Sequence, residues 1–260
     1  MSSSTLQFEI VGSVGKITLN RPEVFNSFNR EMALACIEAL KDCESNPAIR
    51  SIYITGSGKA FCAGQDLQDA MDEKGPEIVQ IVEEHYNPII TLIRQIEKPI
   101  VAGVNGVAAG AGANIALACD IVIATKSAKF IQAFSAIGLI PDSGGTFFLP
   151  RLVGWQKASA LAMLGDRVGA EDAEKMGMIY KWEEDEAFVE GSWKIADRLS
   201  KMPTKGLGLT KRLLNDSLTN NLEQQLKREG EEQKVAAKTD DYDEGVNAFL
   251  EKRKPNFKGE

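Results

Sequence analysis

The chain has 260 residues, of which 43% are hydrophobic, enough to bury a substantial core. Its net charge of −7 argues against a general nucleic-acid-binding protein. The four cysteines lack metal-ligand spacing and His85 is the single histidine, so neither a metal site nor a histidine-based triad is expected. No secretory signal or membrane span is indicated, and the thiols fit a reducing compartment. We therefore predict a cytoplasmic protein with no nucleic-acid or membrane partner.

The first three quarters of the chain alternate strand and helix signals. Residues 8–11 and 16–19 predict a hairpin, and 29–43 carry the apolar spacing of an amphipathic helix. Further elements follow in chain order: a strand over 51–55, a helix over 77–97 interrupted near Pro88, a strand over 99–104, a helix over 109–118 and a strand over 121–124. This alternation predicts an α/β fold.

The pattern changes after about residue 198. Residues 204–219, 221–238 and 241–253 are charged, helical in pattern and nearly free of strand signals. We therefore predict a core over 1–198 and a helical subdomain over 199–260. His85 lies in an acidic helical stretch, which indicates an ordinary surface residue.

Asp142 stands directly before Ser143 and two glycines, in a segment suited to a tight turn that opens a helix. One interpretation is that Asp142 is the N-cap of that helix, since aspartate is among the best N-caps. The other is that Asp142 lies against an apolar wall, where a carboxylate can act as a base. The segment alone leaves both open.

Two glycine-rich segments, 59–67 and 105–113, each follow a predicted strand, where ligand sites of α/β proteins gather. Their glycines fit neither the dinucleotide-binding fingerprint nor a P-loop. Small residues there either permit tight packing or present backbone N–H groups to a ligand. Two such loops can form an oxyanion hole, worth about 3–4 kcal/mol per donor.

These segments resemble those of the crotonase (enoyl-CoA hydratase/isomerase) superfamily, and the likeness extends over nearly the whole chain. The motifs that carry the resemblance are 19–22, 60–67, 105–112, 120–121, 138–141 and 165–173. The resemblance implies a crotonase-like spiral of repeated ββα units, with a C-terminal helical region that forms trimers, often paired into hexamers. It also implies an acyl-CoA substrate and no further cofactor.

The resemblance assigns roles to particular positions. It places the oxyanion donors at the backbone N–H groups of Gln65 and Ala111, the latter at a position where many members have glycine. It also implies a set of residues that bind the substrate or its CoA part: Glu23, Val24, Phe25, Ala63, Gly64, Asp66, Leu67, Gly110, Asn114 and Phe134.

The two glutamates that the best-known hydratases use are replaced here by Asn114 and Phe134. Neither side chain can accept a proton from water near neutral pH, so hydration is disfavoured. Asp142 remains, and its surroundings resemble those of ring-1,2-epoxyphenylacetyl-CoA isomerases, as do 206–211 and 241–250. The resemblance thus implies an isomerase with Asp142 as its base, which converts ring-1,2-epoxyphenylacetyl-CoA to oxepin-CoA, shifts the double bond of 3-enoyl-CoA to give 2-enoyl-CoA, or does both. Phe134, with Phe147 or Phe148 nearby, would keep the pocket dry.

Three other functions stay open at this point. The first is an enoyl-CoA hydratase with weak activity through a water held by Asn114. The second is an aryl-CoA dehalogenase, in which an aspartate at the Asp142 position is the nucleophile, although the tryptophan and histidine that such enzymes use have no evident counterpart here. The third is an acyl-CoA-binding protein without catalysis, in which Asp142 serves only as a helix cap.

Overall fold

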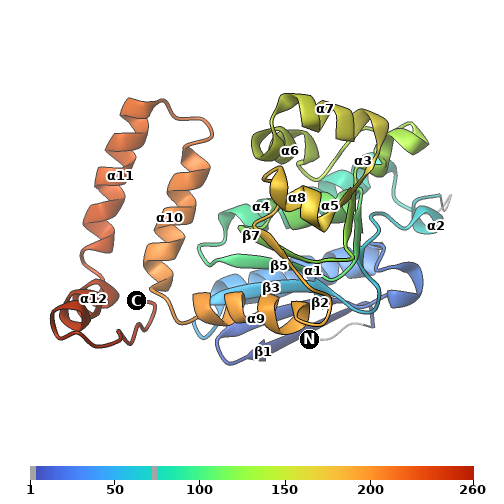
Figure 1. Ribbon diagram of the computed structural model, residues 1–260. Helices are drawn as coiled ribbons and strands as arrows, with labels where there is room; N and C mark the ends of the chain where they lie inside the picture. Colours follow the sequence, from blue (N-terminus) through green and yellow to red (C-terminus); the bar gives the residue numbers. More distant parts are fainter. Residues whose placement is uncertain (1–3, 72–74) are drawn as a thin grey trace.

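The computed structural model of the protein describes residues 4–71 and 75–260 (Figure 1). Over these residues the strands form a sheet of six strands and a sheet of four. The larger sheet contains, in spatial order, β1 (Leu6–Val11), β2 (Val14–Leu19), β3 (Ser51–Gly56), β5 (Ile100–Val104), β7 (Ile121–Thr125) and β10 (Lys181–Glu183). The smaller contains β4 (Ala60–Cys62), β6 (Val107–Ala109), β8 (Lys129–Ile131) and β9 (Arg167–Gly169).

From β3 to β8, consecutive strands alternate between the two sheets. β3, β5 and β7 are parallel neighbours in the larger sheet, and β4, β6 and β8, which directly follow them, are parallel neighbours in the smaller one. A helical segment follows each of these pairs, such as α2 (Leu67–Ala70) after β4 and α5 (Ala111–Ala118) after β6. The expected spiral of ββα units is therefore confirmed. Because β4 and β6 end side by side, the two glycine-rich loops that follow them meet at one edge.

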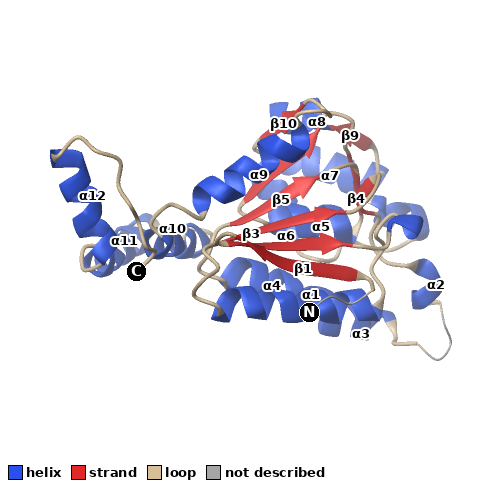
Figure 2. Cartoon of the chain, turned by 90° about the horizontal axis from the view of Figure 1, so that it is seen from below, coloured by secondary structure: helices blue, strands red, loops and turns tan. Residues whose placement is uncertain are grey.

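Helices cover both faces of the larger sheet (Figure 2). Ile52 and Ile54 of β3 share a core cluster with α1 (Arg30–Ser45) and α4 (Asn87–Gln95), whereas Tyr53 packs with α9 (Phe188–Leu199). This alternation follows from the two-residue period of a strand. The predicted amphipathic helix is confirmed as α1, which the Asn29 side chain caps by accepting from the Met32 N–H at 3.0 Å.

The predicted helix over 77–97 is interrupted, but not at Pro88. It consists of α3 (Ile78–Gln80), the π-helical turn η2 (Ile81–Tyr86) and α4, and Pro88 lies in the first turn of α4, where proline is tolerated. The prediction that His85 is a surface residue is wrong, because η2 directs it inward. His85 is 1% exposed, and its Nε2 lies 3.2 Å from Nη1 of Arg30 on α1.

Between η2 and the C-terminal region, short elements surround the smaller sheet. They are η3 (Ala133–Ile137), a 3-10 helix, and the helices α6 (Gly145–Val153), α7 (Trp155–Leu164) and α8 (Ala170–Lys175). The predicted C-terminal helices are confirmed as α10 (Thr204–Asp216), α11 (Leu222–Ala236) and α12 (Asp240–Leu250), which stand beside the core at the left of Figure 1.

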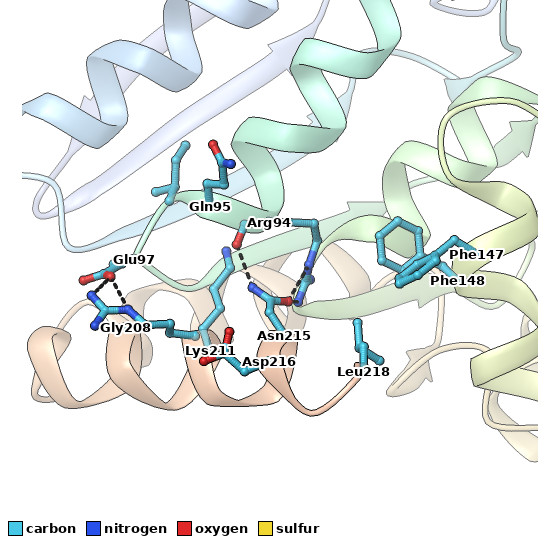
Figure 3. Close-up of a pocket in the computed structure, with 12 residues that line it drawn as sticks. Arg94, Gln95, Glu97, Phe147, Phe148, Gly208, Lys211, Asn215, Asp216 and Leu218 are labelled. Atoms are coloured by element: carbon cyan, nitrogen blue, oxygen red, sulfur yellow. Dashed lines mark hydrogen bonds and ion pairs between the residues drawn. The ribbon is translucent and has the colours of Figure 1, made fainter. Parts of the chain in front are cut away.

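Buried and half-buried polar groups connect α10 to the core (Figure 3). Lys211 of α10 is 7% exposed; its Nζ donates to the Ile93 carbonyl at 2.6 Å and pairs with Asp120 at 2.8 Å. Asn215 accepts from the Arg94 guanidinium through Oδ1 and donates to the Arg94 carbonyl at 2.9 Å. These polar groups fix the position of α10, because each of these α10 side chains is hydrogen-bonded or ion-paired to a residue of the core.

All four cysteines are buried and free. Burial is the largest cause that raises the pKa values of the Cys36, Cys43, Cys62 and Cys119 thiols to about 12. No helix in the described part of the chain is long and apolar enough to cross a bilayer.

Candidate active site

The loops after β4 and β6, together with α2, η2 and η3, enclose a cavity of about 270 Å³. Its described lining is apolar except for the side chains of Gln65, Tyr86 and Asp142. The apolar part consists of Ala63, Gly64, Leu67, Ala70, Ile78, Ile81, Val82, Gly110, Ala111, Ala133, Phe134, Ala136, Ile137 and Leu139. Asp142 is the only carboxylate among these lining residues.

The two glycine-rich loops touch each other at Gly64. Its φ of +97° favours glycine, and a Cβ there would lie 3.1 Å from the Ala109 carbonyl oxygen and 3.6 Å from the Ala111 nitrogen. Ala111 begins α5, so its N–H has no acceptor within the helix. Neither this N–H nor that of Gln65 has an acceptor among the described residues. Two unused donors thus border the same apolar cavity, as an oxyanion hole requires.

Asp142 borders the cavity from a tight turn before α6. Ser143 and Gly144 have φ values of +51° and +73°, and the Ser143 hydroxyl donates to Asp142 Oδ1 at 2.9 Å. Burial is the largest cause that raises the pKa of the Asp142 carboxyl, and the Ser143 bond opposes it. The N-cap interpretation is wrong: the N-cap residue is Gly144, α6 begins at Gly145, and the Asp142 side chain makes no capping bond. The carboxylate is therefore left to face the cavity.

Asn114 does not line the cavity but holds the Asp142 turn from behind. It is 0% exposed, and its Nδ2 donates to the Asp142 backbone carbonyl at 2.9 Å. Its Oδ1 in turn accepts from Nε2 of the buried Gln132 at 2.8 Å. Both ends of the Asn114 amide are therefore bonded within the protein, which gives no support to the hypothesis that Asn114 holds a water.

The other predicted site residues divide into two groups. Those that line the cavity with Asp142 are Ala63, Gly64, Gln65, Leu67, Gly110, Ala111 and Phe134. Glu23, Val24, Phe25 and Asp66 lie outside its described lining. Phe25 contacts the first loop, because its carbonyl accepts from the Ala63 N–H at 3.0 Å. Asp66 pairs with Arg21 at 2.9 Å and caps α2 through the Gln68 N–H.

The cavity wall differs from the sequence-based prediction in two ways: it includes residues that the sequence did not indicate, and it lacks Phe147 and Phe148. Tyr86 and the apolar side chains of Ile78, Ile81 and Val82 come from the region of η2, whose residues show no special pattern. Conversely, Phe147 and Phe148 are not among the described residues that line this cavity. They border a separate one beside α10, where Figure 3 shows them.

Residues 9–260 match the enoyl-CoA hydratase/isomerase family. A 1,2-epoxyphenylacetyl-CoA isomerase of Escherichia coli K12 is 48% identical over 246 residues, 94% of each chain. A probable enoyl-CoA hydratase of Rhodobacter capsulatus is 43% identical over 260 residues, 100% of each chain.

Solved structures agree with this result. A putative enoyl-CoA hydratase from Streptomyces coelicolor A3(2) superposes with a TM-score of 0.93 at 32% identity, covering 98% of this chain and 94% of its own. A putative enoyl-CoA hydratase/isomerase from Mycobacterium abscessus gives a TM-score of 0.92 at 34% identity, and the match covers 97% of this chain and 98% of the other. The chain therefore belongs to the enoyl-CoA hydratase/isomerase family, within the crotonase superfamily.

Proposed function

We propose that this protein is an acyl-CoA isomerase in which Asp142 is the base and the backbone N–H groups of Gln65 and Ala111 form the oxyanion hole. The observation that carries the proposal is the composition of the cavity wall. Among the described residues that line it, Asp142 is the single carboxylate, and it lies in the same cavity as the two unused N–H donors.

The chemistry follows from this arrangement. Removing a proton from the carbon beside a thioester carbonyl places negative charge on the thioester oxygen. Two N–H donors stabilise that enolate more than the neutral substrate, which is the differential binding that catalysis needs. An isomerisation returns the proton at another carbon, so one carboxylate suffices for both steps.

We propose two reactions: ring-1,2-epoxyphenylacetyl-CoA to oxepin-CoA, and 3-enoyl-CoA to 2-enoyl-CoA. The name of the E. coli relative supports the first. The apolar wall with the ring of Phe134, which is 7% exposed, also suits an aromatic or ring-expanded acyl group. Glu23, Val24 and Phe25, with the loop from Ala63 to Leu67, would contact the CoA part.

Hydration is the second candidate, since the R. capsulatus relative is named a probable enoyl-CoA hydratase. Water addition needs groups that orient water and move its protons. At the two positions where hydratases carry glutamates, Asn114 is buried behind the Asp142 turn and Phe134 has no polar group. The described lining also contains no tryptophan or histidine, so the dehalogenase reaction gains no support.

We further propose that residues 1–198 form the catalytic core and residues 199–260 the oligomerisation subdomain of a trimer or a hexamer. Large apolar side chains on the outer helices support this, including Leu222, Phe249 and Leu250, which are 74%, 83% and 71% exposed. A cytoplasmic location fits the four free thiols.

Asp142→Asn tests the proposed function. We expect kcat for the 3-enoyl-CoA double-bond shift and for the epoxide to fall by roughly 10²–10⁴-fold, because the amide cannot accept the proton. Binding of 2-enoyl-CoA, measured by calorimetry, should change little. Asp185→Asn, at an exposed carboxylate bonded to Thr125 outside the cavity, is the control and should keep full activity.

Two results would contradict the proposal. One is isomerisation at the wild-type rate in the Asp142→Asn variant. The other is a wild-type protein that converts 2-enoyl-CoA to 3-hydroxyacyl-CoA faster than it isomerises either substrate, which would favour hydration.

A further inference from the structure

Tyr86 is a polar residue of the cavity wall that the proposed chemistry does not use. Tyr86 is the last residue of the π-helical turn η2 and is only 1% exposed. Its hydroxyl donates to Oε1 of Gln65 at 2.7 Å. A π-turn inserts an extra residue into a helix and is frequent at functional sites. Here the turn brings a buried phenol to the residue whose N–H we propose as an oxyanion donor.

Gln65 is held from several directions. On its backbone, the flanking Gly64 carbonyl accepts from the Phe28 N–H at 2.7 Å, and the flanking Asp66 N–H donates to the Phe28 carbonyl at 2.9 Å. On its side chain, the Tyr86 hydroxyl provides the shortest hydrogen bond. The rings of Phe28 and Tyr86 also pack edge to face, with centroids 5.9 Å apart. Phe28 therefore fixes the backbone on both sides of Gln65, and Tyr86 fixes its side chain.

We infer that Tyr86 is a positioning residue: its hydroxyl fixes the Gln65 side chain and thereby keeps the Gln65 backbone N–H aimed at the thioester oxygen. The inference rests on the proposed oxyanion role of Gln65. Without the hydroxyl, Gln65 Oε1 loses its partner and the side chain is free to turn toward another donor. The backbone bonds of Phe28 would still flank Gln65, but its side chain would lose its shortest hydrogen bond beside Gly64, whose φ is +97°.

The phenol suits this role because it stays protonated. Burial is the largest cause that raises the pKa of Tyr86 well above its ordinary value, and the nearby Cys62 and Asp142 groups add to it. The hydroxyl therefore remains a hydrogen-bond donor throughout the pH range in which Asp142 works as a base. It cannot compete with Asp142 for the substrate proton.

Tyr86→Phe is the first test, with Tyr53→Phe as the matched control. Tyr53 is also buried, at 4% exposed, and its hydroxyl lies 2.8 Å from Ser192 Oγ on the opposite face of the larger sheet, away from the cavity. We expect Tyr86→Phe to lower kcat for 3-enoyl-CoA isomerisation roughly 10- to 100-fold, while KM changes by less than about threefold. The reason is that a misaligned Gln65 N–H weakens the hydrogen bond to the thioester oxygen mainly in the transition state. Tyr53→Phe should change stability alone.

A second readout measures the oxyanion contact without turnover. In an Asp142→Asn background, the thioester C=O stretch of bound 2-enoyl-CoA, labelled with ¹³C at the carbonyl, reports polarisation by the two N–H donors. We expect Tyr86→Phe to shift this band back toward its position in free 2-enoyl-CoA, and Tyr53→Phe to leave it in place. The band is present even if the protein catalyses another reaction, so the inference and the proposed function fail separately.

Gln65→Met removes the same hydrogen bond from the other side. It should reproduce both effects of Tyr86→Phe, and the double variant should be no worse than either single one, because one shared bond is lost. If Tyr86→Phe does not fold, the Gln65→Met variant still tests whether this hydrogen bond positions the Gln65 N–H. An unshifted carbonyl band in both single variants, or an equal loss of kcat in Tyr53→Phe, would overturn the inference.

Discussion

At the scale of single residues, Asp142 is the single carboxylate of the described cavity lining, and buried amides hold the turn that carries it. Asn114, which we aligned with an acidic position of hydratases, lies outside that lining, and its amide donates to the Asp142 backbone carbonyl. Asn114 also fills the space beside Gly145, where a Cβ would lie 2.3 Å from its Nδ2. We therefore propose that Asn114 serves to position Asp142.

The pKa of Asp142 leads to a prediction about activity. Because burial raises this pKa above the ordinary value of 3.8, the rate should increase with pH through an ionisation above that value. The kcat/KM profile of 3-enoyl-CoA isomerisation measures it, since this ratio reports the free enzyme. An acid limb at the pKa of an exposed aspartate would contradict the assignment.

The same raised pKa implies a cost to stability. The folded state binds the Asp142 proton more tightly than the unfolded state does, so stability falls as pH rises through the interval between the two pKa values. Asp142→Asn should therefore melt at a higher temperature than the wild type at pH 7, and the gain should vanish at acid pH below the unfolded pKa. Asp185→Asn should do the opposite at pH 7, because hydrogen bonds from Thr125 and Ser127 lower the pKa of Asp185.

At the scale of elements, α10 is attached to the core through charges that are largely buried. Asp120, directly before β7, receives both Lys211 of α10 and Arg94 of α4. Without Lys211, the Asp120 carboxylate would keep Arg94 at 3.1 Å but lose its more buried cation, and the Ile93 carbonyl would lose its donor. The attachment of α10 therefore depends on all three residues.

We expect Lys211→Met to reduce the free energy of unfolding by about 2 kcal/mol, because the Asp120 carboxylate and the Ile93 carbonyl each lose a hydrogen bond from a buried, charged donor. Lys205→Met on the same helix is the control: its pair with Glu97 spans 3.6 Å with side chains 42% and 37% exposed. That variant should change stability by less than about 0.5 kcal/mol. Urea denaturation followed by circular dichroism measures both, and equal effects would mean that Lys211 is not structurally special.

Elements with a strong periodic pattern could be predicted from the sequence, and irregular ones could not. The apolar spacing of 29–43 predicted α1, and the glycine motifs predicted which loops border the cavity. The π-turn η2 has no comparable pattern, because its extra residue is set by packing against α1, and so Tyr86 and the burial of His85 were missed. Asp142 suited either an N-cap or a base, and the turn geometry of Ser143 and Gly144 excluded the N-cap.

At the scale of the whole molecule, the helices α11 and α12 stand away from the core (Figure 1). Their large apolar side chains Leu222, Phe249 and Leu250 are exposed. Exposed apolar surface of this kind marks an interaction site. We expect light scattering to give three or six times the mass of one chain. Phe249→Glu should lower that mass, while Val189→Glu on α9, at a side chain 73% exposed, should not. A monomeric wild type would contradict the proposed oligomer.

The four buried cysteines also have a consequence for measuring motion. A thiol reagent attacks the thiolate, so a buried thiol whose pKa is about 12 reacts only when its surroundings open. Cys62 Sγ accepts from the Gly64 N–H at 3.4 Å, directly beside the proposed oxyanion donor Gln65, whereas Cys43 lies in α1. The labelling rate of Cys62 relative to Cys43 should therefore report how often the loop around Gly64 opens, with no probe added to the chain.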